Sequence, residues 1–223
     1  MSKIRLVIFD LDGTLVDSVK VVAFILNEMR ASRGLDKLSE ENYSAWVSIG
    51  GKYLVANALD LASENADEAL NEFRRRYAEL PTPSDAIYPG VIKAIESLKS
   101  AGLNICICTN KPRSLAEKVL SETALNRYFD FMVAGGDFQN SKPHPENIWA
   151  CLSQFHVGPT ESILVGDSSV DKTTAENSAV RFAFFEGGYG AGMDVGAINM
   201  KFSSYHDLCG LILSEMGSED RLA

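Results

Sequence analysis

Five short apolar runs constrain the fold of this chain more than any other feature of its sequence. They cover residues 4–9, 103–108, 131–134, 162–166 and 181–185. Each run is continuous rather than alternating, which is typical of strands covered on both faces in a parallel sheet. Helical patterns accompany the later runs, near residues 89–100, 113–122, 145–156, 170–178 and 204–216. This alternation predicts an α/β fold with a doubly wound parallel sheet and right-handed crossovers.

The connection after the first run breaks the alternation, because it reads as helix only. One apolar stripe marks a first helix, at Val22, Ile25, Leu26 and Met29. A second helix opens at Ser39, and a third covers about 66–80 before the Pro-rich return "LPTPSD". We therefore expect two parts, an α/β catalytic core of residues 1–16 and 82–223 and an inserted helical cap domain of residues 17–81.

Composition narrows the class of partner. The chain has 223 residues, 21 basic and 30 acidic, so its formal charge is −9. An acidic surface argues against nucleic acid and anionic membranes as partners. An anionic substrate would have to be held by a local cation, a lysine or backbone N–H groups. No apolar run reaches the roughly 18 residues of a membrane span, and no signal peptide is recognisable. The four cysteines lack CxxC spacing and are expected to be reduced, so we predict a cytoplasmic protein. We expect it to be a monomer or a homodimer.

Polar side chains follow four of the apolar runs. The first run ends in "DLDGT" (10–14), the second in "TN" (109–110), and the fourth in "GDSSVD" (166–171); "SKP" (141–143) lies in the loop after the third. Ligands of an open parallel sheet bind at the carboxyl ends of its strands. The four signatures are therefore expected to meet in one crevice.

The acids of this set suit a hard divalent cation. Asp10, Asp12 and Asp167 can supply oxygen ligands to Mg²⁺, which would also relieve the repulsion between the first two. A carboxylate is a competent nucleophile toward phosphorus and would form an aspartyl phosphate. Asp12 lies two residues beyond Asp10 and points to the same side of an extended chain, so it can protonate the leaving oxygen and then activate water.

The other polar residues suit a phosphoryl group. The Thr109 hydroxyl and the N–H groups of Asn110 and of the turn at Gly13 can donate hydrogen bonds to phosphoryl oxygens. Lys142 can neutralise negative charge on the nucleophile and on the phosphoryl group as charge spreads in the transition state. The set predicts phosphoryl chemistry.

The ordered set DxDGT, T-N, K-P and GDxxxD resembles the four motifs of the haloacid dehalogenase superfamily, in its phosphatase branch. "YPGV" (88–91), "TNKP" (109–112) and "KPHPENI" (142–148) are similar to phosphoglycolate-phosphatase-like and β-phosphoglucomutase-like members. The helical insert resembles the α-helical cap of that superfamily. Two departures concern the subfamily: Val170 stands where many relatives have Asn or Arg, and Ala179 stands where a glycine commonly closes the helix.

The resemblance implies a role for each position. Asp10 would be the nucleophile and a Mg²⁺ ligand, and Asp12 the general acid and base that touches the metal through its backbone carbonyl. Asp167 would be a direct ligand, and Asp171 would ligate the metal or orient a metal-bound water. The remaining two residues would bind the phosphoryl group: Thr109 and Lys142.

Substrate recognition is expected in the cap. "SIGGKYL" (48–54) places Lys52 where related caps present a specificity loop, so Lys52 could meet a carboxylate or a second anionic group of the substrate. The cluster "FRRRY" (73–77) is interpreted as a solvated helix face, because three consecutive residues of a helix point in three directions.

The leading interpretation is a Mg²⁺-dependent phosphatase of a small phosphorylated metabolite, with phosphoglycolate as the first substrate on resemblance alone. A β-phosphoglucomutase-type sugar phosphomutase would use the same residues, so the motifs leave that alternative open. A non-catalytic metal- or phosphate-binding regulatory module is the alternative of a different class, and it would be favoured by loss of the nucleophile, acid or lysine.

Overall fold

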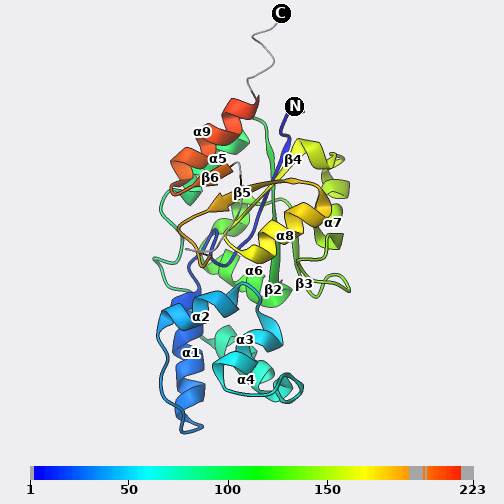
Figure 1. The fold of residues 1–223 in the computed structure, drawn as a ribbon. Coiled ribbons are helices and arrows are strands. Elements are labelled where there is room, and N and C mark those ends of the chain that lie inside the picture. The colour runs from blue at the N-terminus through cyan, green and yellow to red at the C-terminus, as the bar shows by residue number, and fades with distance from the viewer. Residues whose placement is uncertain (1–2, 191–197, 199, 217–223) are drawn as a thin grey trace, which may run out of the picture.

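The computed structural model describes residues 3–190, 198 and 200–216. Its centre is a parallel sheet of six strands in the order β3-β2-β1-β4-β5-β6 (Figure 1). The strands are β1 (Leu6–Phe9), β2 (Asn104–Pro112), β3 (Met132–Gly135), β4 (Ser162–Gly166), β5 (Arg181–Phe185) and β6 (Met200–Phe202). The predicted α/β fold with a doubly wound parallel sheet is confirmed.

The sheet is buried on both faces, which explains why its strands lack alternation. In β1, Leu6 and Ile8 belong to one apolar cluster, whereas Val7 and Phe9 belong to the other. One face is covered by α5 (Val91–Ser100), α6 (Arg113–Glu122) and α9 (Tyr205–Met216), and the other by α7 (Glu146–Phe155) and α8 (Ser169–Ser178). The strand order reverses at β1, so the carboxyl end of β1 lies at the switch point where ligands bind.

Four helices lie between β1 and α5 and form a separate helical unit beyond the carboxyl edge of the sheet (Figure 1). They are α1 (Val19–Ala31), α2 (Glu40–Val47), α3 (Gly51–Ala58) and α4 (Asp67–Glu79). Arg30 is buried in this unit, and its guanidinium donates to the Ala58 carbonyl at 2.6 Å, which ties α1 to the end of α3. All four helices fall within residues 17–81, the range predicted for the cap.

Two elements were missed by the sequence interpretation. The helix α3 begins at Gly51, and both Gly50 and Gly51 have positive φ (70° and 56°), so a glycine pair that reads as a turn in fact opens a helix. The strand β6 has three residues, too short for a periodicity to be recognised. The helix α8 ends at Ser178, and its C-cap residue Ala179 takes the left-handed conformation (φ 56°) usually reserved for glycine.

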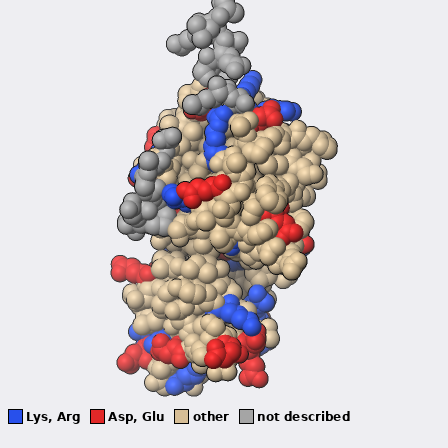
Figure 2. Space-filling model, turned by 45° about the vertical axis from the view of Figure 1, so that its right-hand side comes forward, with Lys and Arg blue, Asp and Glu red and all other residues tan. Residues whose placement is uncertain are grey.

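The distribution of surface charges and the state of the cysteines agree with what the composition predicts. Figure 2 shows acidic and basic side chains interspersed on the helical unit at the bottom of the molecule, without one continuous basic stripe on that face. The four cysteines all lie in the described residues, where they are buried and unpaired. Within the same residues, no helix combines the length and the apolar character that crossing a bilayer requires.

Candidate active site

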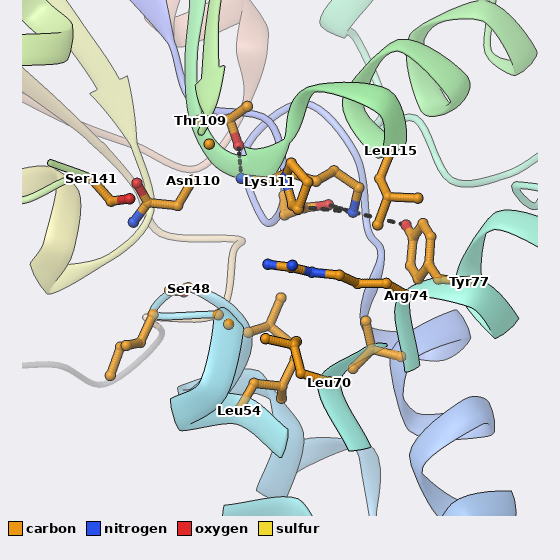
Figure 3. A pocket seen from close by; sticks show the side chains of 18 of the residues that line it. Ser48, Leu54, Leu70, Arg74, Tyr77, Thr109, Asn110, Lys111, Leu115 and Ser141 are labelled. Carbon is orange, nitrogen blue, oxygen red and sulfur yellow. Dashed lines mark hydrogen bonds and ion pairs between the residues drawn. The ribbon is translucent and has the colours of Figure 1, made fainter. Parts of the chain in front are cut away.

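A cavity of about 350 Å³ opens between the carboxyl edge of the sheet and the helical unit (Figure 3). The core side of the cavity carries most of the predicted polar residues, namely Asp10, Asp12, Thr109, Asn110 and Lys142. The helical side is largely apolar and includes Val22, Leu54, Leu70 and Phe73. A cavity of this size lies at the small end of the ~300–1,000 Å³ range of ligand pockets, so it suits a small molecule.

Lys142 is the centre of a buried charge cluster in the floor of the cavity. Its ammonium donates to Asp171 Oδ1 at 2.6 Å and lies 2.9 Å from Asp10 Oδ1. The contact with Asp10 is an ion pair whose geometry does not meet the criteria of a hydrogen bond. Asp10 Oδ1, which is buried, therefore has no hydrogen-bond partner among the described residues. Carboxylate oxygens of Asp10, Asp167 and Asp171 all lie within 4.8 Å of one another.

Asp10, Asp167 and Asp171 lie close together, and Lys142 contacts two of them, Asp10 and Asp171, so the buried cluster has an excess of negative charge. Burial, together with the neighbouring Asp171, raises the pKa of Asp10 to about 7 although Lys142 opposes the shift. Burial and the charges of Asp171 and Asp10 also raise the pKa of Asp167 well above its ordinary value. Burial alone would lower the pKa of Lys142, but the two aspartates that it contacts outweigh this effect and raise it. The cluster therefore favours a further positive charge.

Asp167 is oriented by groups from two distant segments. The Thr14 hydroxyl donates to Asp167 Oδ1 at 2.9 Å, and the Tyr189 N–H donates to Oδ2 at 2.7 Å. Close packing around this carboxylate requires glycine at position 13, where φ is 82° and an added Cβ would lie 2.4 Å from Asp167 Oδ2. The close approach of Asp167 thus explains the glycine of the "DLDGT" turn.

Asp171 and Lys142 are also held in place by local hydrogen bonds. Ser168 caps α8, because its side chain accepts from the Asp171 N–H and its hydroxyl donates to Asp171 Oδ2 at 2.6 Å. The Asn110 side-chain amide pairs with the backbone of Lys142, donating to its carbonyl at 3.0 Å and accepting from its N–H at 2.9 Å. Thr109 Oγ1 accepts from the Lys111 N–H, which leaves its own proton free for a ligand.

Asp12 has a cationic partner of its own, separate from Lys142. The Lys111 ammonium lies 3.1 Å from both carboxylate oxygens of Asp12, and the Ser18 hydroxyl donates to Asp12 Oδ1. Lys111 also donates to the hydroxyl of Tyr77 in α4 at 2.9 Å and lies over its ring at 4.1 Å from the centroid. A single lysine therefore joins Asp12 to the helical unit.

The sequence of the chain matches a known protein family over most of its length. Residues 7–185 match the sequence profile of the haloacid dehalogenase-like hydrolases. The chain belongs to this family. The predicted resemblance is confirmed, and the identified family makes the chain a phosphatase-type hydrolase.

Two relatives of this haloacid dehalogenase-like hydrolase and one similar solved structure carry the name phosphoglycolate phosphatase. Phosphoglycolate phosphatase 1 of Pseudomonas aeruginosa is 33% identical over 198 residues, which cover 86% of this chain and 72% of the relative. Phosphoglycolate phosphatase of Cereibacter sphaeroides is 34% identical and covers 82% of this chain and 85% of its own. A crystal structure of a predicted phosphoglycolate phosphatase from Haemophilus somnus superposes with a TM-score of 0.84 at 26% identity, covering 95% of this chain and 99% of its own.

Two residues expected to bind substrate in this hydrolase lie outside the cavity lining. The Gly13 N–H donates to the Val16 carbonyl at 2.8 Å, so it is engaged within its own turn. The Lys52 ammonium pairs with Asp67 at 2.8 Å on the exposed surface of the helical unit. The residues that line the cavity from the neighbouring loop are Ser48, Ile49, Gly50 and Gly51.

Three residues of the site were missed by the sequence interpretation of the hydrolase. Arg74 and Tyr77 line the cavity from α4, and Lys111 lines it from the end of β2. The cluster "FRRRY" was interpreted as a solvated helix face, and Arg74 and Arg75 are indeed exposed. Arg75 and Arg76 form ion pairs along the helix, and what the interpretation missed is that the exposed Arg74 also lines the cavity. The available signal was the spacing, because Arg74 shares a helix face with Leu70 and Tyr77 at positions i−4 and i+3.

Proposed function

We propose that this chain is a Mg²⁺-dependent phosphatase that hydrolyses the monophosphate ester of a small metabolite through an aspartyl phosphate on Asp10. The observation that carries the proposal is the buried set of Asp10, Asp167 and Asp171 around Lys142 at the floor of a small cavity. Phosphoglycolate is the first substrate to test, since the two relatives above bear that activity in their names. A cytoplasmic location stays a prediction from the sequence.

The domain organisation belongs to the same proposal. Residues 1–16 and 82–223 would form the catalytic core, and residues 17–81 a cap that closes over the substrate and excludes water. The position of the cavity between the sheet edge and the helical unit supports this division. Lys111 reaches from the core to Tyr77 of the cap, so closure would bring the cap into contact with the partner of Asp12.

The residues present fit a hard divalent cation. Their donors are carboxylate oxygens, which Mg²⁺ prefers, and Asp10 Oδ1 is buried without a hydrogen-bond partner. Asp10, Asp167 and Asp171 would hold the ion by their side chains, and the backbone carbonyl of Asp12 would complete the protein's share. The ion would supply positive charge that holds the phosphoryl oxygens and offsets the charge that develops on them.

The first half of the reaction would use Asp10 and the phosphoryl-binding residues. A carboxylate oxygen of Asp10 attacks phosphorus, the bond from phosphorus to the ester oxygen breaks, and an acyl phosphate forms. Lys142, 2.9 Å from Asp10 Oδ1, neutralises charge that spreads over the phosphoryl oxygens. Thr109 donates its free proton to one of those oxygens, since its acceptor side is already satisfied by the Lys111 N–H.

Asp12 would handle the protons. It donates a proton to the leaving ester oxygen, and in the second half it accepts a proton from the water that attacks phosphorus and releases Asp10. Asp12 lines the cavity, and Lys111 and Ser18 hold its side chain there. Asn110 acts through Lys142, whose backbone it fixes on both the N–H and carbonyl sides.

A substrate panel tests the proposal directly. The purified chain is assayed with Mg²⁺ against phosphoglycolate, sugar phosphates and simple phosphate esters, and inorganic phosphate and sugar phosphate isomers are both measured. Release of phosphate that requires Mg²⁺ is the expected result. Interconversion of glucose phosphates with little phosphate release would instead identify a mutase, and inactivity on the panel with a metal still bound would identify a binding module.

Lys111 gives a prediction for proton handling. Lys111→Met removes the cation 3.1 Å from both oxygens of Asp12 while keeping the length of the side chain. Because a positioned acid contributes about 10²–10⁴-fold to turnover, misplacing it is expected to lower kcat about 10- to 100-fold. Steady-state kinetics with phosphoglycolate, or with the best ester of the panel, measure the change.

Tyr77→Phe is the matched control for Lys111→Met. It removes the hydroxyl that accepts from Lys111 but keeps the ring under the ammonium and the ion pair with Asp12. We expect kcat to change less than about threefold, because the lost hydrogen bond does not involve Asp12 and the Lys111 ammonium stays paired with that carboxylate. Equal losses in the two variants would show that Lys111 acts on the cap rather than on Asp12.

A further inference from the structure

Arg74 is the cation of the cavity whose charge is left over once the phosphoryl site is assembled. Five charged residues line the cavity, namely Asp10, Asp12, Arg74, Lys111 and Lys142. Lys142 pairs with Asp10, and Lys111 pairs with Asp12. Arg74 has no carboxylate, hydrogen-bond or ring partner among the residues that the structure describes. One positive charge therefore stands free in a cavity that suits a small anion.

The sequence of α4 explains why Arg74 alone is free. Its neighbours in the chain are satisfied at helical spacing, because Arg75 pairs with Glu79 at 2.9 Å and Arg76 pairs with Glu72 at 2.5 Å. The residues four positions either side of Arg74 are Leu70 and Ala78, which offer no charge. The helix thus neutralises two of its three arginines and leaves the third without an acid.

The direction of the side chain places this charge in the substrate's path. Figure 3 shows Arg74 extending from α4 across the cavity, with Asn110 and Lys111 on the core side and Leu54 and Leu70 on the cap side. The phosphoryl-binding groups all come from the core, so a phosphate held there would point its organic part toward the cap. The guanidinium lies on that side of the cavity.

We propose that Arg74 binds a carboxylate on the organic part of the substrate and so selects phosphate esters of small hydroxy acids over neutral esters. The inference rests on the proposed phosphatase function and names the substrate class of that site. A guanidinium presents two parallel N–H donors that match the two oxygens of a carboxylate. Leu54 and Leu70 line the cavity beside it, and the Arg74 side chain is exposed, so a substrate carboxylate can reach it from solvent.

The assignment replaces the role that the sequence suggested for Lys52. Both residues belong to the cap, but the Lys52 ammonium is already paired with Asp67 and does not line the cavity. Arg74 meets both requirements that Lys52 lacks, a free charge and a position in the lining. Lys52→Met is consequently expected to leave the substrate preference unchanged within about twofold.

The test compares two substrates that differ only in the group that Arg74 would bind. Phosphoglycolate and ethyl phosphate have the same length, and the second carries a methyl group where the first carries the carboxylate. Arg74→Gln is expected to lower kcat/KM for phosphoglycolate about 10- to 100-fold, as expected for a lost charged hydrogen-bonded contact, and to change kcat/KM for ethyl phosphate less than about threefold. Arg75→Gln, the neighbour already paired with Glu79, is the matched control and should change neither.

Charge reversal makes the test two-sided. Arg74→Glu should raise kcat/KM for phosphoethanolamine, whose tail is a cation, relative to phosphoglycolate, because the sign of the preferred tail would be inverted. Equal losses for phosphoglycolate and ethyl phosphate in Arg74→Gln would overturn the inference and place Arg74 on the phosphoryl group. Unchanged kinetics in both variants would overturn it as well.

A binding measurement separates this inference from the proposed function. Calorimetric titration of Asp10→Asn with the same two esters, with and without Arg74→Gln, needs no turnover. A preference for phosphoglycolate that depends on Arg74 supports the inference even if the wild-type chain hydrolyses no ester, in which case the phosphatase proposal alone fails. Equal affinity for the two esters in the presence of Arg74 overturns the inference while leaving the phosphatase proposal standing.

Discussion

Asp10→Asn is expected to lower kcat at least about 10⁴-fold, the scale on which loss of a covalent nucleophile is felt in other enzymes. The amide keeps the size of the side chain but is a far poorer nucleophile than a carboxylate. Asp10 also lies in the buried carboxylate cluster, with Oδ1 2.9 Å from the Lys142 ammonium, so the substitution would remove the attacking atom and one proposed cation ligand together. Release of inorganic phosphate under saturating substrate and Mg²⁺ measures the effect.

The controls for this variant distinguish lost chemistry from lost folding. Asp10 is buried and its pKa is raised to about 7, so its negative charge destabilises the metal-free folded state at neutral pH. The neutral amide of Asn should therefore not lower the melting temperature. Asp130→Asn is the matched surface change: Asp130 is exposed, its partner among the described residues is Lys99, and its loss should leave kcat unaltered. Turnover that survives Asp10→Asn would rule out the aspartyl phosphate.

Removal of the metal is the second change with a large expected effect. We expect chelation by EDTA to lower phosphate release at least about 10³-fold and added Mg²⁺ to restore it, because the proposed ion would offset part of the negative charge of the buried carboxylates and of the phosphoryl oxygens. Saturation at about 100 times the Kd stabilises the fold by about 2.7 kcal/mol, or roughly 5–10 °C in melting temperature for a chain of this length. Thermal melts with and without Mg²⁺ measure this shift.

The pH dependence of that shift has a definite sign. The pKa of Asp10 rises from 3.8 to about 7 on folding, and that of Asp167 rises in the same direction. Between about pH 4 and pH 7 the metal-free folded chain therefore holds more protons than the unfolded chain, so its free energy of unfolding decreases as pH rises through this window. The metal requires the deprotonated carboxylates, so its stabilising effect increases across the same window.

Melts at about pH 5 and about pH 8 give the clearest comparison. The gain from Mg²⁺ should be several degrees at the higher pH and close to zero at the lower. Lys142→Met would sharpen the contrast, because loss of the ammonium leaves Asp10 and Asp171 without their shared partner and should make the metal-free chain less stable at high pH. A gain from Mg²⁺ that is equal at both pH values would contradict the assignment of these carboxylates to the metal.

The elements built on apolar periodicity could be predicted from the sequence, and so could the meeting of four motifs at the sheet edge. Strands and crossover helices of the core have a strong local signal, and a parallel sheet necessarily collects the ends of its strands at one edge. Asp10, Lys142, Asp167 and Asp171 were identified in this way and lie together in the structure.

The parts that the sequence did not indicate depend on contacts between distant segments. Gly51 begins α3 and Gly50 is its N-cap, although a glycine pair is more typical of a turn. Lys111 carries no local signal for its position between Asp12 and Tyr77, because those two residues are 99 and 34 positions away. The free charge of Arg74 became visible only when the two sides of the cavity were placed together.

The tyrosine that orients Asp167 also limits how the helical unit can swing. The Tyr189 hydroxyl accepts from the N–H groups of Ser18 and Val19 at 2.6 and 3.0 Å, while its backbone N–H holds Asp167. The first residues of α1 are therefore anchored to the strand edge that carries the carboxylates. A swing that preserves this anchor must pivot beyond Val19, inside α1, and one that pivots before it must break the two hydrogen bonds to the Tyr189 hydroxyl. One residue therefore contacts both parts of the molecule, Asp167 through its backbone N–H and the start of α1 through its hydroxyl.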